Sequence, residues 1–419
     1  MSLRHRPSRP LIAALAVAVT LPLTAWVIPV MPVTTAAEAA PAAGTAGSVS
    51  GAGSGSGSVS GSAASARPAA AAPFRVTPLA TYRNPWAASF LGRTGYLAIT
   101  ERTGRLVLRS TSGRQLAVSG LPRVATAGQG GLGDVLAHPG YNGTTNRTVY
   151  LSWAEPGTGG RSGAAVGRAT LVIAPKAASA RLSGLQVIWR QYPKTTGSGH
   201  FSHRLAIDPS RRYLFVSSGD RQKMTPAQDL RVTLGKIVRL SLSGRAAPGN
   251  PFAARGGVSA QIWSYGHRNP LGLAFDGQGR LWSSEMGPKG GDELNLIARG
   301  RNYGWPKASN GSHYDGRPIP DHRAGDGFVA PRAWWNPSIS PGGLMIYSGA
   351  RFPAWRGDAF VPALSGQGLA RVDLQGTTAR KANFWPMGKR IREVEQGPDG
   401  YIYLLEDGPS GRLLRLTPR

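Results

Sequence analysis

One pattern of hydrophobic and polar positions recurs along most of the chain. Each copy starts with a short apolar run, passes through a turn containing Gly, Pro or Asp, and ends in a second run containing Tyr, Leu or Trp. Apolar runs that flank such a turn are typical of β-hairpins. The copies occupy residues 86–101, 134–153, 205–220, 273–285 and 394–407, with a looser copy at 344–363.

The spacing of these hairpins predicts the architecture. They recur roughly every 50–60 residues without a long amphipathic helix between them, which favours a β-propeller of about six blades. We therefore predict an all-β fold, a six-bladed β-propeller, with residues 74–419 as one domain. The N-terminal strand of that domain is expected to complete the last blade. Propellers include hydrolases, lyases, dehydrogenases and binding modules, so the fold alone does not indicate a function.

The chain in front of this domain has two parts. Residues 1–39 read as an export signal, with arginines at 4, 6 and 9, an apolar segment at 11–30 and a small-x-small cleavage site at 37–39. A retained anchor that tethers the protein to a membrane is the alternative, because the apolar segment is nearly long enough to span a bilayer. Residues 40–73 are rich in Ala, Gly and Ser and predict a flexible, disordered linker. The protein is therefore expected to be exported, as a periplasmic, secreted or cell-envelope protein.

Composition narrows the class of partner and of chemistry. The chain has 49 Lys and Arg against 21 Asp and Glu, a formal net charge of +28. The arginines are scattered without a basic run, so a broadly basic surface is expected and no nucleic-acid partner is predicted. The chain has no cysteine, which excludes disulfides, thiol chemistry and a lipoprotein anchor.

Charges and glycines are densest at residues 261–306. Arg268 and Asn269 follow an aromatic run, and Gly287–Pro288 precede a Gly-Gly pair and the acidic residues Asp292–Glu293. Glycine-rich backbone can turn several carbonyls toward one centre, and hard cations bind carbonyl and carboxylate oxygens. The segment could form a cation site next to an anion-binding Arg/Asn pair. A turn-rich loop with surface charges is the alternative.

A second candidate site lies in the hairpin at 205–220. His200 precedes its first strand and Asp220 ends its second, so the hairpin could bring the two side chains together. A carboxylate beside an imidazole orients its tautomer and raises its basicity, as a general base requires. His203 is the competing base in the same loop.

Several longer motifs carry a family resemblance. SYGHRNPLGLAFD, EMGPKGGDELNLI and GRNYGWP follow one another in the dense segment, with GQGGL and AQDL…LGKI upstream. Across residues 82–419 the chain resembles the soluble quinoprotein aldose dehydrogenases of the glucose/sorbosone dehydrogenase family, which are six-bladed propellers. The family pattern places its catalytic histidine four residues before an arginine, here Arg204, and so favours His200 over His203.

The resemblance implies a cofactor, pyrroloquinoline quinone (PQQ), held with Ca²⁺. Three carboxylates on PQQ need fixed cations, which guanidinium groups provide. The implied catalytic residues are His200, Asp220 and Arg268. The implied cofactor-binding residues are Gln129, Arg268, Asn269, Tyr314, Ser365, Arg390 and Arg392. The implied calcium ligands are Gly287 and Pro288 next to the cofactor, with Glu293 and Tyr303 at a further calcium site.

The implied reaction is the oxidation of an aldose at C1 to a lactone. His200 would take the hydroxyl proton, hydride would pass to the quinone, and the electrons would leave to an external acceptor. Calcium and Arg268 would stabilise the charge that develops on the quinone oxygen.

Two positions depart from the family pattern. Gly199 stands where some members carry Asp, which weakens an expectation of strict glucose specificity. Ser365 stands where the family often has a cofactor-binding Lys, so weaker PQQ binding is expected unless Arg371 or Lys389 compensates.

Two other functions remain open from the sequence. One is a secreted propeller that binds carbohydrate or protein without redox chemistry. The other is a calcium-dependent lactone hydrolase, whose carboxylate and Asn ligands in the central channel have no recognisable counterpart in the sequence.

Overall fold

The computed structural model describes residues 72–419. The predicted export signal (1–39) and residues 40–71 of the predicted linker lie outside the described residues. The described part of the chain contains β-strands and five short 3-10 helices, and no α-helix. The 3-10 helices are η1 (Pro175–Ala177), η2 (Thr225–Gln228), η3 (Ala253–Arg255), η4 (Gly257–Gln261) and η5 (Pro353–Trp355).

Each predicted hairpin forms the first two strands of an antiparallel, four-stranded meander. The first two meanders are joined by parallel pairing of β5 with β9, which makes one eight-stranded sheet. Their strands are β2 (Pro85–Phe90), β3 (Tyr96–Glu101), β4 (Arg105–Ser110) and β5 (Gln115–Ser119), then β6 (Leu132–Ala137), β7 (Thr148–Pro156), β8 (Ser162–Ile173) and β9 (Ala180–Arg190).

Three separate four-stranded sheets follow along the chain. They are β10 (Ser202–Ile207), β11 (Tyr213–Ser218), β12 (Lys236–Ser241) and β13 (Ile262–Tyr265); β14 (Pro270–Phe275), β15 (Leu281–Glu285), β17 (Asp292–Ile297) and β19 (Ala333–Trp335); and β20 (Met345–Ile346), β21 (Ala359–Ala363), β22 (Gly368–Gln375) and β23 (Thr378–Pro386). A small ribbon joins β16 (Lys289–Gly290) to β18 (Gly311–Ser312).

The two ends of the described chain meet in the last sheet. β24 (Ile391–Gln396), β25 (Ile402–Glu406) and β26 (Gly411–Pro418) form a meander, and β1 (Phe74–Tyr82) pairs antiparallel with β26 as its outer strand. The N-terminal strand therefore completes the last sheet, as we expected.

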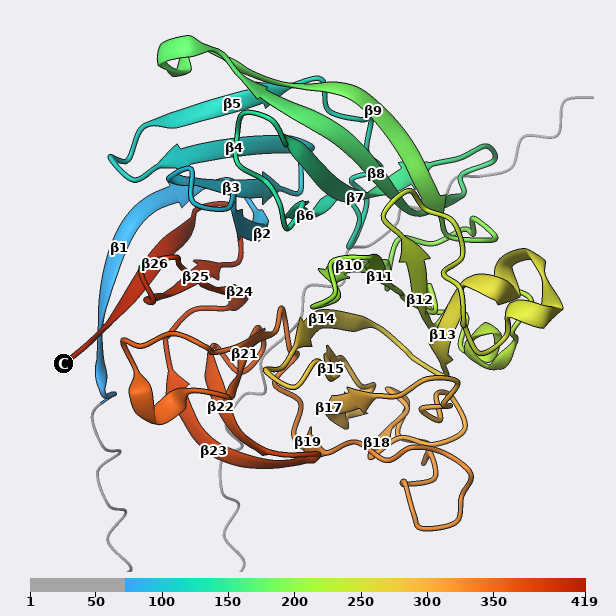
Figure 1. Cartoon of the computed structure of the whole chain (residues 1–419). Coiled ribbons are helices and arrows are strands. Elements are labelled where there is room, and N and C mark those ends of the chain that lie inside the picture. Colours follow the sequence, from blue (N-terminus) through green and yellow to red (C-terminus); the bar gives the residue numbers. More distant parts are fainter. Residues whose placement is uncertain (1–71) are drawn as a thin grey trace, which may run out of the picture. The chain divides into compact units, whose positions relative to one another are not determined.

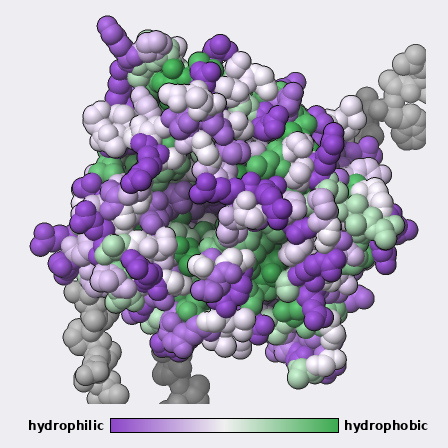
Figure 2. All heavy atoms as spheres, viewed as in Figure 1, coloured by the Kyte–Doolittle hydropathy of each residue, from purple (hydrophilic) through white to green (hydrophobic). Residues whose placement is uncertain are grey.

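The sheets surround a common centre (Figure 1). The first strand of each meander lies innermost, and these strands contact their neighbours in a closed order, β2, β6, β10, β14, β20, β24 and again β2. The fold is thus all-β and propeller-like. The face in Figure 2 is largely hydrophilic and is hollowed near the centre of the ring.

The core lies mainly between neighbouring sheets. Fully buried Trp282 on β15 packs with Val361 on β21 in one cluster, and Phe74 on β1 packs with Tyr347 and Leu404 in another. Burial of apolar surface stabilises at about 25 cal/mol per Å², so these clusters hold the sheets in fixed positions. The loops between strands are therefore presented from a rigid frame.

Candidate active site

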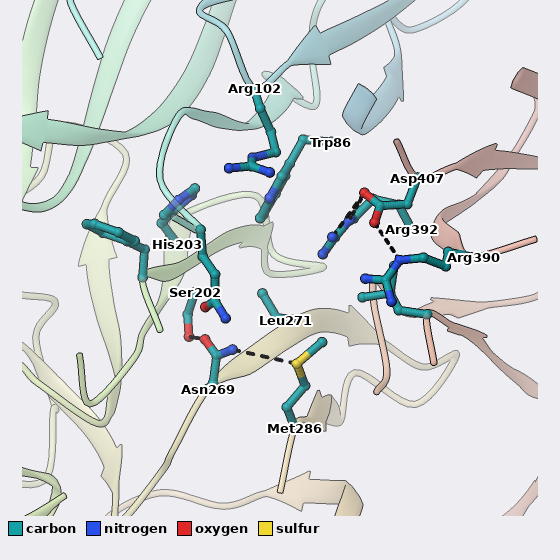
Figure 3. Close-up of a pocket in the computed structure, with 13 residues that line it drawn as sticks. Trp86, Arg102, Ser202, His203, Asn269, Leu271, Met286, Arg390, Arg392 and Asp407 are labelled. Carbon is teal, nitrogen blue, oxygen red and sulfur yellow. Dashed lines mark hydrogen bonds and ion pairs between the residues drawn. The ribbon is translucent and has the colours of Figure 1, made fainter. Parts of the chain in front are cut away.

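A pocket opens among the loops that lead into the innermost strands (Figure 3). Arg390, Arg392 and Asp407 lie on one side of it in this view, and Ser202 and His203 lie on the other. Four residues predicted as cofactor-binding line the pocket. The full lining is Trp86, Arg102, Gln129, Phe201, Ser202, His203, Asn269, Leu271, Met286, Leu364, Arg390, Arg392 and Asp407.

His200 and Asp220 are brought together as predicted. Nδ1 of His200 lies 2.7 Å from Oδ1 of Asp220, and both side chains are buried. Oδ2 of Asp220 accepts a hydrogen bond of 2.8 Å from Nε1 of Trp305. Gly219 makes the approach of the two chain segments possible, because a Cβ there would lie 2.0 Å from the carbonyl oxygen of His200.

The electrostatics of this pair suit a neutral imidazole beside an ionised carboxylate. Burial lowers the pKa of His200, and the hydrogen bond that His200 donates to Asp220 offsets part of that effect. Burial would raise the pKa of Asp220, but the hydrogen bonds from His200 and Trp305 hold it below its ordinary value. With Nδ1–H directed to Asp220, Nε2 of His200 keeps its lone pair, and no described residue hydrogen-bonds to it.

The loop that carries both histidines has an uncommon backbone. His200, Ser202 and His203 have φ of 48°, 57° and 52°, in the left-handed region that residues other than Gly rarely adopt. Such conformations cluster at functional sites, where the surrounding structure enforces them. The strain here coincides with the residues that form one side of the pocket.

His203 has different surroundings from His200. Its ring stacks on Trp86 at a centroid distance of 5.0 Å, and its Nδ1 lies 3.0 Å from Oγ of Ser152. Burial lowers its pKa to about 3, so the ring is neutral. His203 lines the pocket, whereas His200 lies beside it, but no described carboxylate pairs with His203.

Arg268 and Asn269 are held by Glu285, a residue that the sequence analysis did not include in the site. Oε1 of Glu285 accepts hydrogen bonds from the backbone N–H groups of Arg268 and Asn269, and Oε2 lies 2.9 Å from Nδ1 of His267. The side chain of Asn269 accepts a hydrogen bond of 2.9 Å from Ser202 and lines the pocket. Glu285 therefore fixes the direction of both residues.

The guanidinium group of Arg268 lies next to the loop predicted to bind cations. Its Nη1 donates to the carbonyls of Met286 (3.1 Å) and Gly287 (2.6 Å), and its Nη2 donates to Tyr314 Oη (3.1 Å). Its Nε is buried without a hydrogen-bond partner among the described residues. The Nε–H of Arg268 is thus available to donate a hydrogen bond to a bound ligand.

Arg390 and Arg392 share one carboxylate, Asp407. Nε of Arg390 donates to Oδ2 at 2.9 Å, and Nε and Nη2 of Arg392 donate to Oδ1 at 3.2 and 3.1 Å. Burial would raise the pKa of Asp407, but Arg392 and Arg390 hold it below its ordinary value. The carboxylate keeps two like charges close together in the wall of the pocket.

Gln129 connects the pocket to His200. Its Oε1 accepts a hydrogen bond of 2.8 Å from the backbone N–H of His200. Arg102 holds the loop around it, donating through Nε to Gly130 (3.2 Å) and through Nη2 to the Gly128 carbonyl. Arg102 also lines the pocket and adds a third arginine to its wall.

The predicted calcium ligands lie together in a small cavity. Gly287, Pro288, Glu293 and Tyr303 all line it, as do Arg268 and Glu285. Burial raises the pKa of Glu293. Within residues 72–419 no three His, Asp or Glu side chains are arranged to hold a metal ion, so an ion here would also need backbone oxygens, as the sequence motif implied.

Three of the residues carried over as cofactor-binding lie outside the pocket lining, namely Arg268, Tyr314 and Ser365. Tyr314 is 73% exposed and contacts the site through Arg268. Ser365 is exposed, and its hydroxyl donates to Ser338 O and Ser340 Oγ. Gly199 lies against Gln222, whose amide carbon would be 2.4 Å from a Cβ at that position.

Sequence reasoning missed several pocket residues. Asp407 had a recognisable signal, because it follows the second strand of its hairpin as Asp220 does. Trp86, Arg102 and Met286 had no local signal, since they meet the other lining residues only after the sheets close into a ring. Leu271 and Leu364 read as ordinary core positions.

The central channel also differs from the sequence expectation. Asp134, Glu393 and Glu395 line a cavity between the innermost strands, although no carboxylate set had been recognised there. Arg204 forms an ion pair with Glu393 and lies 3.7 Å from Asp134. Arg204 therefore pairs with two of the three carboxylates that line this cavity. No helix in residues 72–419 is long and apolar enough to cross a bilayer.

Comparison with known proteins places this geometry in a family. Residues 82–415 match the family described as Glucose / Sorbosone dehydrogenase. The chain is 37% identical over 342 residues to the aldose sugar dehydrogenase YliI of Escherichia coli, covering 80% of this chain and 90% of that protein.

Solved structures agree with this match. The soluble aldose sugar dehydrogenase of Escherichia coli in its apo form is 36% identical with a TM-score of 0.77, covering 83% of this chain and 100% of that one. The PQQ-bound aldose sugar dehydrogenase of Streptomyces coelicolor is 27% identical with a TM-score of 0.68, covering 83% and 98%. These similarities confirm the resemblance drawn from the motifs: the chain belongs to the glucose/sorbosone dehydrogenase family and is an oxidoreductase.

Proposed function

We propose that the protein oxidises aldose sugars at C1 to lactones, depends on PQQ and Ca²⁺, and passes the electrons to an external acceptor. The observation that carries the proposal is the His200–Asp220 pair beside a pocket lined by Arg390, Arg392 and Asn269. The names of the Escherichia coli and Streptomyces coelicolor relatives support the sugar substrate, and the latter was solved with PQQ bound.

The charge of the pocket wall suits a polyanionic cofactor. Arg102, Arg390 and Arg392 give its wall fixed positive charge, which matches the carboxylates of PQQ. Nδ2 of Asn269 has a weak contact, 3.8 Å to the sulfur of Met286, and remains a donor for a quinone oxygen. The unpartnered Nε of Arg268 is a further donor near this region.

His200 is arranged to take the proton from the C1 hydroxyl. Asp220 fixes the tautomer in which Nε2 is the acceptor, and burial keeps the imidazole neutral near neutral pH. A positioned general base of this kind contributes roughly two to four orders of magnitude to a rate. When bound, PQQ would supply the quinone that accepts the hydride from C1.

The residues around Arg268 would stabilise charge and hold calcium. Arg268 is anchored on the Gly287 carbonyl, which has a second lone pair for a calcium ion. Gly287 and Pro288 would bind the calcium next to the cofactor. Glu293 and Tyr303 would bind the further calcium ion. A fixed guanidinium group in a buried site can stabilise negative charge that develops during the reaction.

We also propose the finer architecture and location that the sequence predicts. The eight-stranded sheet counts as two blades, so the meanders make a six-bladed propeller formed by residues 74–419. Residues 1–39 would be an export signal or anchor and 40–73 a linker. The enzyme would then act outside the cytoplasm, where the external acceptor and the sugar are available.

The test is dye reduction by the purified protein reconstituted with PQQ and Ca²⁺, with a panel of aldoses as donors. We expect turnover that requires PQQ, Ca²⁺ and an aldose together, with lactone as product. PQQ binding without turnover on any aldose would replace this proposal with a carbohydrate- or protein-binding propeller.

A further inference from the structure

Trp305 contacts two groups of the proposed site that lie on different sheets. The residue is 7% exposed, and its indole Nε1–H donates a hydrogen bond of 2.8 Å to Oδ2 of Asp220. Cζ of Arg268 lies 5.3 Å from the centroid of its ring, within the range of a cation–π interaction. One side chain therefore touches both the carboxylate behind His200 and the guanidinium group beside the predicted cation loop.

The surroundings of Trp305 leave its indole little freedom to turn away from Asp220. The backbone N–H of Trp305 donates to the carbonyl of Gly266 at 3.0 Å, and its carbonyl accepts a hydrogen bond of 2.7 Å from Nε2 of Gln228. The ring packs in one buried cluster with Ala227 and Ile319. The indole N–H is thus presented to the carboxylate from a fixed frame.

The carboxylate of Asp220 has few other constraints on its second oxygen. Oδ1 accepts hydrogen bonds from Nδ1 of His200 at 2.7 Å and from the backbone N–H of Gln222 at 2.8 Å. Oδ2 accepts the indole N–H and a longer bond of 3.2 Å from the backbone N–H of Met224. Without the indole, the carboxylate would be freer to rotate, and the direction of its hydrogen bond with His200 would change.

We infer that Trp305 is a positioning residue of the proposed sugar oxidation, which fixes the imidazole of His200 by acting through Asp220. The same ring packs against the guanidinium group of Arg268, so the base and the charge-stabilising group keep one geometry relative to each other. The inference rests on the proposed function, in which His200 is the base. Trp305 does not line the pocket, so its role is to hold other residues rather than to touch the sugar or the cofactor.

The charges around His200 give this role a measurable sign. The charged groups that face the imidazole are Asp220 at the end of β11, Arg268 before β14 and Glu285 at the end of β15. Burial lowers the pKa of His200, Asp220 and Glu285 raise it, and Arg268 lowers it. Burial raises the pKa of Asp220, whereas the hydrogen bonds from His200 and the indole hold it below its ordinary value. Removal of the indole N–H leaves more of the carboxylate charge to stabilise the imidazolium, so the pKa of His200 should rise.

The experiment uses the full chain without PQQ or sugar. The protein is isotopically labelled at histidine, and the resonance of His200, assigned by its absence in His200→Ala, is titrated with pH by NMR. The variant Trp305→Phe keeps an aromatic ring and removes the N–H donor. The matched control is Trp189→Phe, because Trp189 is also buried and its Nε1 donates to Gln261 at 2.9 Å outside the pocket lining. The pKa of His200 should rise in Trp305→Phe and keep its wild-type value in Trp189→Phe.

A second background shows whether the effect passes through Asp220. In Asp220→Asn, the further change Trp305→Phe should not move the pKa of His200, because the carboxylate that the indole stabilises is gone. An unchanged or lowered pKa in Trp305→Phe would overturn the inference, as would an equal rise in Trp189→Phe or in the Asp220→Asn background. The wild type offers a test without substitution, since the indole N–H resonance of Trp305 should shift as His200 titrates. A resonance that stays constant would also overturn the inference.

Turnover of the protein reconstituted with PQQ and Ca²⁺ is a separate measurement. Trp305→Phe should lower kcat about tenfold, the amount that a hydrogen bond to a charged group contributes, and should move the acid limb of kcat/KM to higher pH. Trp189→Phe should leave both unchanged. A lower kcat without a shift of the acid limb would mean that Trp305 only packs the site, and would overturn the inference. Absence of turnover in the wild type would reject the proposed function, while the NMR titration still decides whether Trp305 acts on His200 through Asp220.

Discussion

Nδ1 of His200 lies 2.7 Å from Oδ1 of Asp220, and the two residues stand at opposite ends of one hairpin, before β10 and after β11. The same relationship recurs in other sheets. In each case an acidic residue at the end of the hairpin's second strand accepts hydrogen bonds from residues that lie just before its first strand or at its start. The further pairs are Glu101 with the backbone of Arg83, Glu285 with the backbone of Arg268 and Asn269, and Asp407 with Arg390 and Arg392. Repetition of one structural device thus presents several site residues around a common centre.

The first prediction concerns the base. His200→Ala should lower kcat by roughly two to four orders of magnitude, the usual effect of losing a general base, while PQQ binding stays nearly unchanged. His203→Ala is the control, because its ring packs on Trp86 and has no carboxylate partner. Steady-state kinetics and a PQQ titration measure both effects. An inactive His203→Ala variant together with a mildly affected His200→Ala variant would reverse the assignment.

The second prediction is the pH dependence of kcat/KM. A general base works when it is unprotonated, so activity falls as the pH drops through its pKa. Burial lowers the pKa of His200, so the acid limb of the profile should lie below pH ~6.5, the ordinary value for histidine.

The variant Asp220→Asn sharpens this test. Asp220 raises the pKa of His200 against the effect of burial, so its neutral replacement should move the acid limb to still lower pH. The maximal rate should also fall, because the amide no longer fixes the tautomer. An acid limb that stays in place or moves to higher pH would show that His200 is not the titrating base.

The fold could be predicted largely from local sequence. A β-hairpin depends on alternation and a turn within about twenty residues, so all the repeated hairpins were found, and Asp220 was found with His200 because one hairpin contains both. The completion of the last sheet by β1 was also expected, although no residue pattern indicated it. The exact strand bounds and the parallel pairing of β5 with β9 were not.

The site could be predicted less completely, because it is assembled across sheets. Trp86 stacks on His203 from a different sheet, and nothing near Trp86 in the sequence indicates that contact. Gln129 and Asn269 came from motif resemblance and do line the pocket. Tyr314 and Ser365 were also predicted from the family resemblance, but they lie outside the lining of the pocket. A sequence match identifies the corresponding position, whereas the conformation of the surrounding loop decides where that side chain lies.

The third prediction concerns a buried lysine near Asp220. Lys236 is fully buried, and its Nζ donates to the carbonyls of Pro226, Ala227 and Leu234 at 2.8, 3.0 and 2.6 Å. Burial lowers its pKa to about 7, whereas the unfolded chain has an ordinary value of about 10.4. Between these values the unfolded state binds more protons, so the free energy of unfolding should rise with pH.

Urea unfolding at pH 7 and pH 9 tests this linkage. The wild type should gain stability relative to Lys236→Met between the two pH values, because methionine does not titrate. The exposed Lys307→Met variant should leave the pH dependence unchanged. A constant difference between wild type and Lys236→Met would mean that Lys236 keeps its proton in the folded protein.

The last prediction concerns Ser365 and the missing lysine. Of the two cations suggested as substitutes, Arg371 is held by Asp358 and Asn383, and Lys389 is not among the residues that line the pocket. Arg102, which the sequence analysis did not suggest, does line it. We predict that Arg102 supplies the missing charge. Bonds to charged groups contribute about 1.5–3 kcal/mol against about 0.5–1.5 for neutral ones, so a needed cation should be worth about tenfold in PQQ affinity.

Titration of PQQ into the calcium-loaded apoprotein separates the two positions. Arg102→Gln alone should bind PQQ more weakly than the wild type does. Adding Ser365→Lys to Arg102→Gln should raise PQQ affinity about tenfold, whereas Ser365→Lys in the wild type should raise it by less than tenfold. Arg102 also holds the Gly128 and Gly130 carbonyls around Gln129, so Arg102→Lys is the control that keeps the charge without the guanidinium fork. If Ser365→Lys tightens binding tenfold in the wild type, position 365 faces the cofactor and Arg102 does not replace the lysine. If the substitution has no effect in either background, a side chain at position 365 does not reach the cofactor, and the prediction is wrong.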